Sequence, residues 1–364
     1  MRITFVNDSI GYGGAAKVMT VIAKGLANKG HSVSIINLNL NNAGIYQDTA
    51  GLEIITANLK FGKGLLVNLK YSLFTIKAVK TLHSDILIGF KTFPNFCAVL
   101  AGMVLNIPSV ISERANPFVV FRNPRFSTKV KLFFINHASA AVFQTEGASK
   151  FYSKHLQEKS AIIPNPILFD GSSFFVNYDK RPKTVVSLGR FDNKQKRLDV
   201  LIESFALFHK SHPDYSLVIY GAGKDENMLM PLIKRENLEE SVRVAGLSRN
   251  SLNDLSREGI FIITSDYEGI SNSLLEAMAV GLPVVSTDHS PGGARMLITD
   301  HENGLLVPVG DAPAIAAALS EYAENPDLAR ECGINAKKVL DRFALEKIVE
   351  KWEGTLQKTV NQYS

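Results

Sequence analysis

The sequence predicts an α/β protein with two doubly wound parallel sheets, one in each half of the chain. Short apolar strands alternate with helical segments from the first residues onward, and this β–α–β rhythm is typical of a parallel sheet covered by helices on both faces. The rhythm stops over residues 164–183, which are rich in Pro, Gly, Ser and Asn, and then starts again. A chain of 364 residues is also long enough for two domains of ordinary size.

Each half provides its own set of elements. In the first half, residues 14–29 have the apolar spacing of a helix, and strands are predicted at 2–7, 32–38, 85–89, 108–111, 140–144 and 161–163. In the second half, residues 198–211 are predicted to form a helix, and strands are predicted at 184–188, 215–220, 242–245, 260–264 and 283–286. A last helix carries the single Trp of the chain, Trp352, and a helix of this kind usually docks on another surface.

These elements predict four segments. Residues 1–165 form a first Rossmann-like domain, 166–182 a linker, 183–343 a second Rossmann-like domain, and 344–364 the last helix. Because ligands of such sheets bind at the carboxyl ends of the strands, we expect the functional site in the cleft between the two domains.

The composition excludes several classes of protein. Hydrophobic residues make up 46% and charged residues 21% of the chain, which are globular values. Cys97 and Cys332 are the only cysteines and fit no metal-binding pattern, which argues against a disulfide scaffold or a structural zinc site. The first residues lack the layout of a signal peptide, and no uncharged apolar run reaches the roughly 18 to 20 residues of a membrane span. We therefore expect a cytoplasmic protein, and a peripheral position on the inner face of the membrane is left open.

The charge is distributed unevenly. Residues 1–180 carry 19 Lys and Arg against 9 Asp and Glu, a net charge of +10, whereas residues 181–364 carry 21 against 26, a net charge of −5. Several cations of the first half recur on one predicted helix face or lie among phenylalanines: Lys63, Lys70, Lys77, Arg122, Arg125, Lys129 and Lys131. This pattern suits an anionic membrane surface, and a solvated helix face beside core aromatic residues explains it equally well. No nucleic-acid-binding module is visible, so nucleic acid is not an expected partner.

The most informative segment is SDYEGISNSLLEAMAVGLPVV at residues 265–285. Glu268 precedes a predicted helix, and Glu276 lies about two turns inside it. The N-terminus of a helix presents unpaired N–H groups and attracts phosphate, and a carboxylate accepts hydrogen bonds from vicinal hydroxyls. The segment therefore suits a sugar nucleotide, and an ordinary strand–loop–helix with a solvated glutamate pair is the alternative.

A glycine-rich loop follows the first predicted strand. Gly11, Gly13 and Ala16 satisfy the G-x-G-x-x-A pattern of dinucleotide-binding sites. That pattern also needs an acidic residue at the end of the second strand, where this chain has Asn37-Leu38-Asn39, so NAD is not expected. The glycines still predict that the backbone approaches another ligand closely at the start of a helix. A simple tight turn is the alternative.

A cationic loop follows the strand at 184–188. Its residues Gly189–Arg197 contain four cations: Arg190, Lys194, Lys196 and Arg197. Arginine offers a planar fork to phosphate oxygens and lysine offers a movable point charge. Such cations stabilise the negative charge that develops on a departing nucleoside diphosphate.

Together these segments resemble the retaining glycosyltransferases of the GT-B fold, in glycosyltransferase family 4 (glycosyl transferases group 1). The similarity covers nearly the whole chain, through the segments GYGGAAKV, IPNPI, GRFDNKQKRLDVLIESF, EGISNSLLEAMAVGLPVV and NGLLVP in that order. A fold with two Rossmann-like domains and a last helix that crosses back to the first domain is what this resemblance implies.

The resemblance also implies roles for single residues. Glu276 would hold the ribose of the donor and Glu268 the hydroxyls of its sugar, with Arg190 and Lys196 on the diphosphate. The other donor-binding residues would be Gly13, Gly14, Gly269, Ser271, Asn272 and Ser273. Arg190, Lys196 and Glu268 would be the catalytic residues. Many relatives carry a His in the acceptor loop, where this chain has Ser112-Glu113-Arg114, as relatives that act on lipid-linked oligosaccharides often do; acceptor contacts by Glu113 and Arg114 are expected on that basis.

The expected reaction is transfer of a hexose or N-acetylhexosamine from a nucleotide sugar, UDP-linked in preference to GDP-linked, to a glycan acceptor in bacterial surface polysaccharide synthesis. A polyprenyl-diphosphate-linked acceptor is expected. No Asp-x-Asp sequence is present, so neither a metal nor another cofactor is expected to hold the diphosphate. Two alternatives remain: a nucleotide-sugar epimerase of the same fold, which would need carboxylates and His at the cleft for acid–base work, and a non-catalytic sugar-nucleotide-binding relative.

Overall fold

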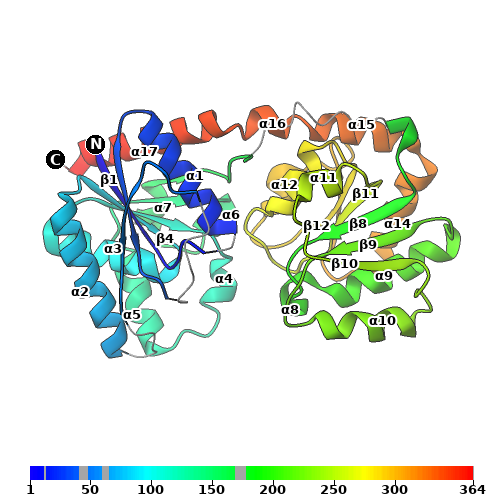
Figure 1. The fold of residues 1–364 in the computed structure, drawn as a ribbon, viewed down its shortest axis with the longest axis horizontal. Helices are drawn as coiled ribbons and strands as arrows, with labels where there is room; N and C mark the ends of the chain where they lie inside the picture. Colours follow the sequence, from blue (N-terminus) through cyan, green and yellow to red (C-terminus); the bar gives the residue numbers. More distant parts are fainter. Residues whose placement is uncertain (12–13, 41–47, 60–64, 169–177, 364) are drawn as a thin grey trace. The chain divides into compact units, whose positions relative to one another are not determined.

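A computed structural model describes residues 1–11, 14–40, 48–59, 65–168 and 178–363. The chain divides into two compact units, unit 1 with Met1–Leu168 and Phe343–Ser364, and unit 2 with Phe169–Arg342. The segment that ends the chain therefore makes its contacts in unit 1, although unit 2 lies between in sequence (Figure 1).

Seven parallel strands form the sheet of unit 1, in the order β3-β2-β1-β4-β5-β6-β7. They are β1 (Arg2–Asn7), β2 (Ser32–Asn37), β3 (Glu53–Thr56), β4 (Ile86–Phe90), β5 (Ser109–Glu113), β6 (Ala140–Phe143) and β7 (Ser160–Ile162). The chain builds outward from β1 on one side and from β4 on the other, so the switch point of this sheet lies between β1 and β4. All except β3 were predicted from the sequence.

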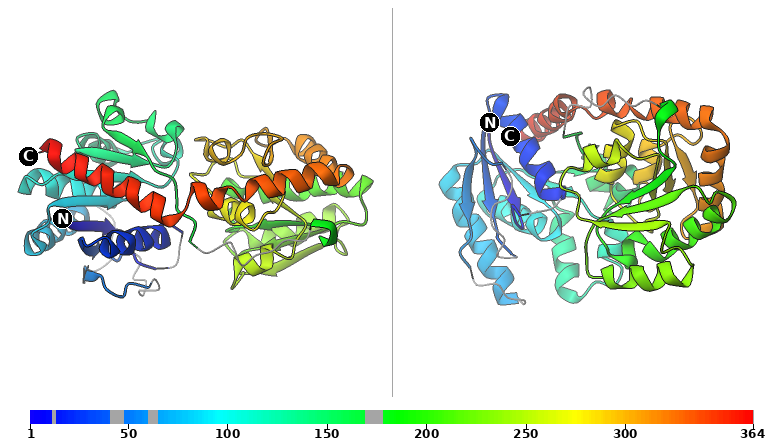
Figure 2. Two further views of the ribbon diagram at one scale, coloured as in Figure 1. Left: turned by 90° about the horizontal axis from the view of Figure 1, so that it is seen from above. Right: turned by 45° about the vertical axis from the view of Figure 1, so that its right-hand side comes forward.

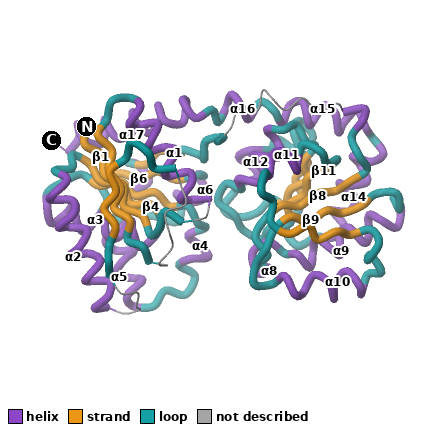
Figure 3. The backbone as a smooth tube through the Cα atoms, viewed as in Figure 1, coloured by secondary structure: helices purple, strands orange, loops and turns teal. Residues whose placement is uncertain are grey.

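Helices cover both sides of this sheet (Figure 3). They are α1 (Gly14–Asn28), α2 (Leu65–Leu82), α3 (Thr92–Leu105), α4 (Pro117–Val120), α5 (Phe126–Ile135), α6 (Glu146–Ser149), α7 (Lys154–Glu158) and α17 (Leu345–Tyr363). Helix α3 packs on β4 and β5, whereas α17 packs beside α1 (Figure 2).

Helix α17 is anchored in unit 1 by its one large aromatic residue. Trp352 is fully buried and stacks on Phe90, the last residue of β4, with 6.5 Å between the ring centroids. Just before this helix, Phe343 O accepts a hydrogen bond of 2.9 Å from Ile167 N, so the two segments that connect unit 1 to unit 2 run side by side. Burial of the whole indole ring strongly stabilises the packing of this helix on the sheet through the hydrophobic effect.

Six parallel strands form the sheet of unit 2, in the order β10-β9-β8-β11-β12-β13. They are β8 (Thr184–Leu188), β9 (Ser216–Tyr220), β10 (Val242–Gly246), β11 (Ile260–Ile263), β12 (Val284–Thr287) and β13 (Leu305–Val307). The predicted strands of this half agree with these bounds to within one residue at either end, because their short apolar runs are bounded by polar or Gly-containing turns.

The helices of unit 2 are α8 (Asn193–Lys196), α9 (Leu198–Ser211), α10 (Leu229–Arg235), α11 (Ser251–Leu255), α12 (Asn272–Ala279), α13 (Gly293–Leu297), α14 (Ala312–Glu324), α15 (Pro326–Ala336) and α16 (Val339–Arg342). The predicted helix over 198–211 matches α9. Its buried face, with Leu201, Phe205 and Phe208, packs with α14 and the sheet in one core. Among the residues that the structure describes, no helix combines the length and the apolar character that a membrane span needs.

Candidate functional site

Arg190, Lys196 and Glu268, three of the residues predicted to bind the donor, follow neighbouring strands at the switch point of the unit 2 sheet. After β8 the chain adds β9 and β10 on one side, and then β11, β12 and β13 on the other, so β8 and β11 are neighbours. Arg190 and Lys196 follow β8, and Glu268 follows β11. The carboxyl ends of two neighbouring parallel strands meet at one edge, where ligands of doubly wound sheets bind.

Lys196 and Glu268 form an ion pair at the centre of this site. Lys196 Nζ lies 2.5 Å from Glu268 Oε1, and the side chains are only 15% and 13% exposed. Ser265 Oγ donates a hydrogen bond of 3.3 Å to the same carboxylate oxygen. A Cβ on Gly189 would lie 3.1 Å from Lys196 Cε, so the glycine makes room for the lysine side chain. An ammonium suited to phosphate thus stands beside a carboxylate suited to hydroxyls.

Hydrogen bonds join the loop after β8 to the loop after β11. Thr264 Oγ1 donates to Lys196 O at 2.8 Å, and Asp266 N donates to Gln195 O at 2.9 Å. Gln195 Nε2 in turn donates to Tyr267 O at 3.2 Å. The ion pair therefore rests on a fixed backbone frame and does not depend on two independent loops.

The four cations of this loop have different surroundings. Arg197 is committed to Asp199 and Asp266, with N–O distances of 3.0 and 3.1 Å. Arg190 is exposed and donates to Gln195 Oε1 at 3.3 Å, and Lys194 is exposed as well. Arg190 and Lys194 are therefore accessible to an anion, whereas Arg197 serves the structure of the loop.

Helix α12 starts a few residues later than the sequence predicts, so Glu276 lies less deep in it. The helix begins at Asn272, so Glu276 is its fifth residue, a little more than one turn from the start and not two. The N-cap residue Ser271 makes no side-chain capping bond; its Oγ lies 3.0 Å from Ser273 Oγ. The N-cap side chain accepts none of the first N–H groups, so the prediction that this helix start binds an anion remains compatible with the geometry. Gly269 lies just before it, at the packing contact with Gly293.

The structure adds His289, which sequence reasoning missed. His289 follows β12, is 1% exposed, and neither of its ring nitrogens has a hydrogen-bond partner among the residues that the structure describes. Burial lowers the pKa of His289 to about 4, while the charges of Glu268 and Lys196 act on it in opposite directions. The ring is therefore neutral at pH 7, with one donor and one acceptor unused. Its position after a strand of the same sheet was the available signal.

Gly221 and Gly223 allow backbone segments of the site to pack closely. A Cβ on Gly221 would lie 1.9 Å from Gly189 O, and one on Gly223 would lie 2.3 Å from Phe191 O. Gly189 N donates to Tyr220 O, at the end of β9, at 3.0 Å, and Phe191 N donates to Ala222 O, in the loop that follows, at 2.9 Å. The two glycines thus let one loop pack against another, and the atoms that lie close to them belong to the protein backbone.

In unit 1 the glycine-rich loop follows β1, at the switch point of that sheet. Gly14 is exposed and begins α1, whereas Gly13 lies outside the residues that the structure describes. Close to this point, Lys91 follows β4 with a left-handed φ of 83°, and its Nζ contacts both carboxylate oxygens of Asp8 at 3.0 and 2.9 Å. A positive φ at a lysine is strained, and such strain is held where the surroundings enforce it. The sequence offered no signal for this pair.

Glu113 is buried within unit 1. It is 2% exposed, and its carboxylate accepts hydrogen bonds from Thr92 Oγ1 at 3.1 Å and from the backbone of Arg114 and Ala115 at 3.0 and 3.3 Å. Tyr152 Oη donates to it at 3.4 Å. Burial raises the pKa of Glu113 in spite of these donors.

Arg114 is directed toward the sheet and the last helix. Its guanidinium lies 4.4 Å from the centre of the Phe90 ring and 5.7 Å from that of Trp352, and donates to Asn165 Oδ1 at 3.1 Å. Burial lowers its pKa to about 9. In this structure both residues face the interior, so their contact with an acceptor stays a prediction that would require them to become uncovered.

Within the described ranges, no group of three or more His, Cys, Asp or Glu side chains is arranged to hold a metal ion.

Comparison with known proteins agrees with this arrangement of the chain. Residues 12–168 match the family described as Glycosyltransferase Family 4, and residues 171–339 match Glycosyl transferases group 1. A relative from Campylobacter jejuni, N-acetylgalactosamine-N,N'-diacetylbacillosaminyl-diphospho-undecaprenol 4-alpha-N-acetylgalactosaminyltransferase, is 31% identical over 300 residues, which cover 80% of each chain. An uncharacterized glycosyltransferase from Haemophilus influenzae is 27% identical over 362 residues, 98% of this chain and 99% of the relative.

A solved structure shows the same fold. The Anabaena protein HepE, crystallised with UDP, superposes with a TM-score of 0.81 and 18% identity, over 98% of this chain and 100% of HepE.

Proposed function

Because this chain belongs to the glycosyltransferases of family 4 (glycosyl transferases group 1) and has their GT-B fold, we propose that it transfers a hexose or N-acetylhexosamine from a UDP-sugar to a glycan acceptor, with retention of configuration. The observation that carries the proposal is the Lys196–Glu268 pair at the switch point of unit 2, with Arg190 beside it.

The proposal gives each part of this site one task. Lys196 and Arg190 neutralise the diphosphate, and the start of α12, from Gly269 to Ser273, offers N–H groups to phosphate and sugar oxygens. Glu268 holds sugar hydroxyls and Glu276 the ribose. The Gly13–Gly14 loop of unit 1 is proposed to close over the diphosphate.

The chemistry then needs no protein nucleophile. The bond between the anomeric carbon and the diphosphate breaks first through an oxocarbenium-like state, and the acceptor oxygen attacks from the same face. The leaving phosphate takes the proton of the acceptor hydroxyl. Cations fixed before the reaction stabilise the negative charge that grows on that phosphate.

A UDP-linked donor is supported by relatives. HepE was crystallised with UDP, and the Campylobacter relative is named for N-acetylgalactosaminyl transfer. The name of that relative also states an undecaprenyl-diphosphate-linked substrate, which supports a lipid-linked acceptor for this chain.

The test is the release of nucleoside diphosphate from a panel of UDP- and GDP-sugars, with membrane lipid extract as the acceptor. We expect release from a UDP-sugar only when acceptor is present. Lys196→Met or Arg190→Met should lower the rate about 10²-fold or more, as removal of an electrostatic transition-state contact does. Lys210→Met, an exposed lysine of α9, is the matched control. Near-normal rates in both site variants would refute the proposal, and epimerisation of the donor without acceptor would favour the epimerase alternative.

The proposal extends to an anionic membrane surface, because unit 1 exposes apolar and basic side chains together. On α5 the side chains of Phe126 and Phe133 are 82% and 61% exposed. Arg122, Arg125 and Lys129 are exposed beside them, whereas Lys131 turns back to lie 4.7 Å from the centre of the Phe93 ring. Exposed aromatic rings with flanking cations suit the interface of an anionic bilayer.

Helix α2 repeats the pattern with exposed Leu69, Leu73, Lys70 and Lys77; Lys63 lies outside the described residues. Sedimentation with vesicles of anionic lipid at low salt tests whether this surface binds a membrane. Binding should fall when Phe126 and Phe133 are both changed to Ser, and an absence of binding by the unchanged protein would contradict it.

A further inference from the structure

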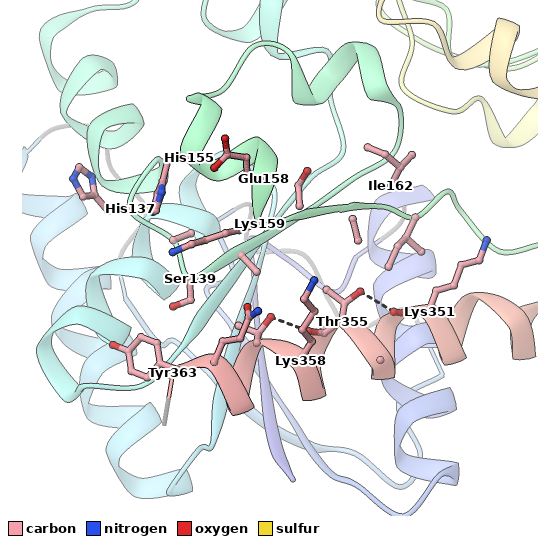
Figure 4. A pocket seen from close by; sticks show the side chains of 18 residues that line it. His137, Ser139, His155, Glu158, Lys159, Ile162, Lys351, Thr355, Lys358 and Tyr363 are labelled. Carbon is pink, nitrogen blue, oxygen red and sulfur yellow. Dashed lines mark hydrogen bonds between the residues drawn. The ribbon is translucent and has the colours of Figure 1, made fainter.

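Unit 1 contains a groove that lies apart from the two switch points. It has a volume of about 820 Å³ and runs between α17 and the edge strand β7, with the turn before β6 at one end (Figure 4). Its walls include Ser139, Lys159, Ser160, Lys351, Thr355 and Lys358. The groove belongs wholly to residues of unit 1.

The helix wall of this groove is one face of α17. Lys351, Thr355, Lys358 and Gln362 follow one another at spacings of four, three and four residues, which places them in one row along the helix. From Lys351 to Gln362 this row is about 16 Å long, at 1.5 Å per residue. Figure 4 shows Lys351, Thr355 and Lys358 along the helix, with Lys159 and Ser139 on the opposite wall.

The groove carries more positive than negative charge, with three lysines and one glutamate among its lining residues. Lys159, Lys351 and Lys358 are exposed, and their ammonium groups take part in no ion pair among the described residues. Glu158 is the one carboxylate among the lining residues. By contrast, Glu353 of the same helix is not among those residues and is paired with Lys29 and His31, at 2.8 Å each. The helix thus leaves its cations unpaired on the side that faces the groove.

Gly354 is the second feature that indicates a ligand. It lies near the middle of α17, a helix of 19 residues, where a glycine costs about 1 kcal/mol relative to Ala. No heavy atom of the described residues lies within 4 Å of the position that a Cβ would take there, so none of those residues requires the glycine. Gly354 lines the groove, and its missing side chain lets a bound molecule approach the helix backbone.

The opposite wall adds hydrogen-bonding groups. Strand β7 is the last strand of its sheet and pairs only with β6, so one side of its backbone is left without a strand partner. Ser139 and Ser160 bring hydroxyls, and Gln362 brings an amide from the helix. Ammonium groups beside hydroxyls and an amide match a ligand with both acidic groups and many hydroxyls.

We propose that this groove binds an anionic oligosaccharide, one that bears carboxylate or phosphate groups, with Lys159, Lys351 and Lys358 on the acidic groups and Gly354 allowing close contact with α17. This inference rests on the proposed function. The anionic oligosaccharide would be the part of the acceptor glycan that is remote from the reacting hydroxyl. The end of the groove at Ile163 and Lys351 is the end at which β7 terminates, on the carboxyl edge of the sheet. Single-stranded nucleic acid fits less well: His137, His155 and Tyr363 gather at the other end in Figure 4 and form no run of stacking platforms.

The test measures binding without any donor. Fluorescently labelled hexagalacturonate is the anionic probe, maltohexaose the neutral one, and a ten-residue thymidine oligonucleotide the nucleic acid, each followed by anisotropy at low and moderate salt. We expect salt-dependent binding of hexagalacturonate, little binding of maltohexaose, and weaker binding of the oligonucleotide. Lys351→Gln with Lys358→Gln should weaken hexagalacturonate about tenfold, for two partly screened charged contacts.

Two further variants separate binding from folding and from overall charge. Lys210→Gln with Lys234→Gln removes the same charge from exposed positions of unit 2 and should leave binding unchanged. Gly354→Gln should weaken binding about tenfold while the unfolding midpoint followed by Trp352 fluorescence stays equal or rises, because the helix gains a better former. The proposal is wrong if the two lysine pairs behave alike, if no probe binds at millimolar concentration, if the oligonucleotide binds more tightly, or if Gly354→Gln binds normally.

These outcomes are distinct from failure of the proposed function. Hexagalacturonate binding that depends on the groove lysines would stand even if no nucleotide sugar were turned over. Suppose that no probe binds and that the Lys351→Gln, Lys358→Gln variant transfers sugar to the membrane acceptor normally. This result would refute ligand binding by the groove and leave the proposed glycosyltransferase activity standing.

Discussion

The Lys196–Glu268 pair supports a prediction that separates its structural role from its catalytic one. The perturbations are Lys196→Met, Glu268→Gln and the double variant. The side chains are 15% and 13% exposed, so each single change leaves a charge with little access to water. Breaking a fully buried pair costs about 3 to 5 kcal/mol; with this residual exposure we expect about 2 kcal/mol for each single variant of unit 2.

The double variant should be less destabilised than the sum of the two, with a coupling energy of about 1 to 2 kcal/mol, because removing both charges removes the uncompensated one. For a unit of this size, 2 kcal/mol corresponds to a fall of about 4 to 8 °C in the unfolding midpoint. Transfer activity should not recover in the double variant, since it lacks both the phosphate contact and the sugar contact.

The assay is calorimetry together with fluorescence. The only Trp of the chain, Trp352, belongs to unit 1, so its emission reports unit 1 while calorimetry reports both units. The Trp352 transition should be unchanged in all three variants. Arg190→Met, which removes an exposed cation of the same loop, is the control and should change stability by less than about 0.5 kcal/mol. Single-variant effects that simply add, within about 0.5 kcal/mol, would refute the reasoning.

Three other predictions follow from single features. The pKa of His289 is held at about 4, below its ordinary 6.5. Unit 2 should therefore keep its full stability above about pH 6.5 and lose roughly 3 kcal/mol as the pH falls toward 4. His289→Asn should flatten this dependence of the calorimetric stability on pH, and an unaltered slope would count against the prediction. Transfer should continue in EDTA, because cations and a helix start are proposed to hold the diphosphate; loss of activity that Mg²⁺ restores would contradict that. Trp352→Ala should destabilise unit 1 by about 3 to 5 kcal/mol and leave the unit 2 transition in place, and one common shift of both transitions would show the reasoning to be wrong.

The sequence predicted the elements with a strong local period. The strands of unit 2 and α9 agree closely with the structure because each reads as a short apolar run or an amphipathic repeat with a clear end. Strand β3 was missed because its four residues are half-exposed or exposed and carry little apolar alternation. The depth of Glu276 in α12 was overestimated since Gly269 to Ser271 belong to the loop before the helix.

The site was predictable as a set of residue types and less so as a set of contacts. The pairing of Lys196 with Glu268 joins positions 72 residues apart, which no local pattern encodes. The burial of Arg114 depends on Trp352, which arrives from the other end of the sequence. His289 belongs to no motif; its position after β12 was the one signal in the sequence, and its burial beside charged groups came only with the structure.

The place of α17 has a consequence for the order in which the chain folds during synthesis. In the order of synthesis, all residues of unit 2 precede α17, so unit 2 is complete at Arg342 before any residue of that helix has been made. Unit 1 is interrupted by unit 2: Phe90 and Arg114 can contact Trp352 only after more than 200 further residues have been synthesised. Over that interval the nascent chain exposes an apolar strip along its first sheet, and a ribosome-bound chaperone has there a defined surface to protect.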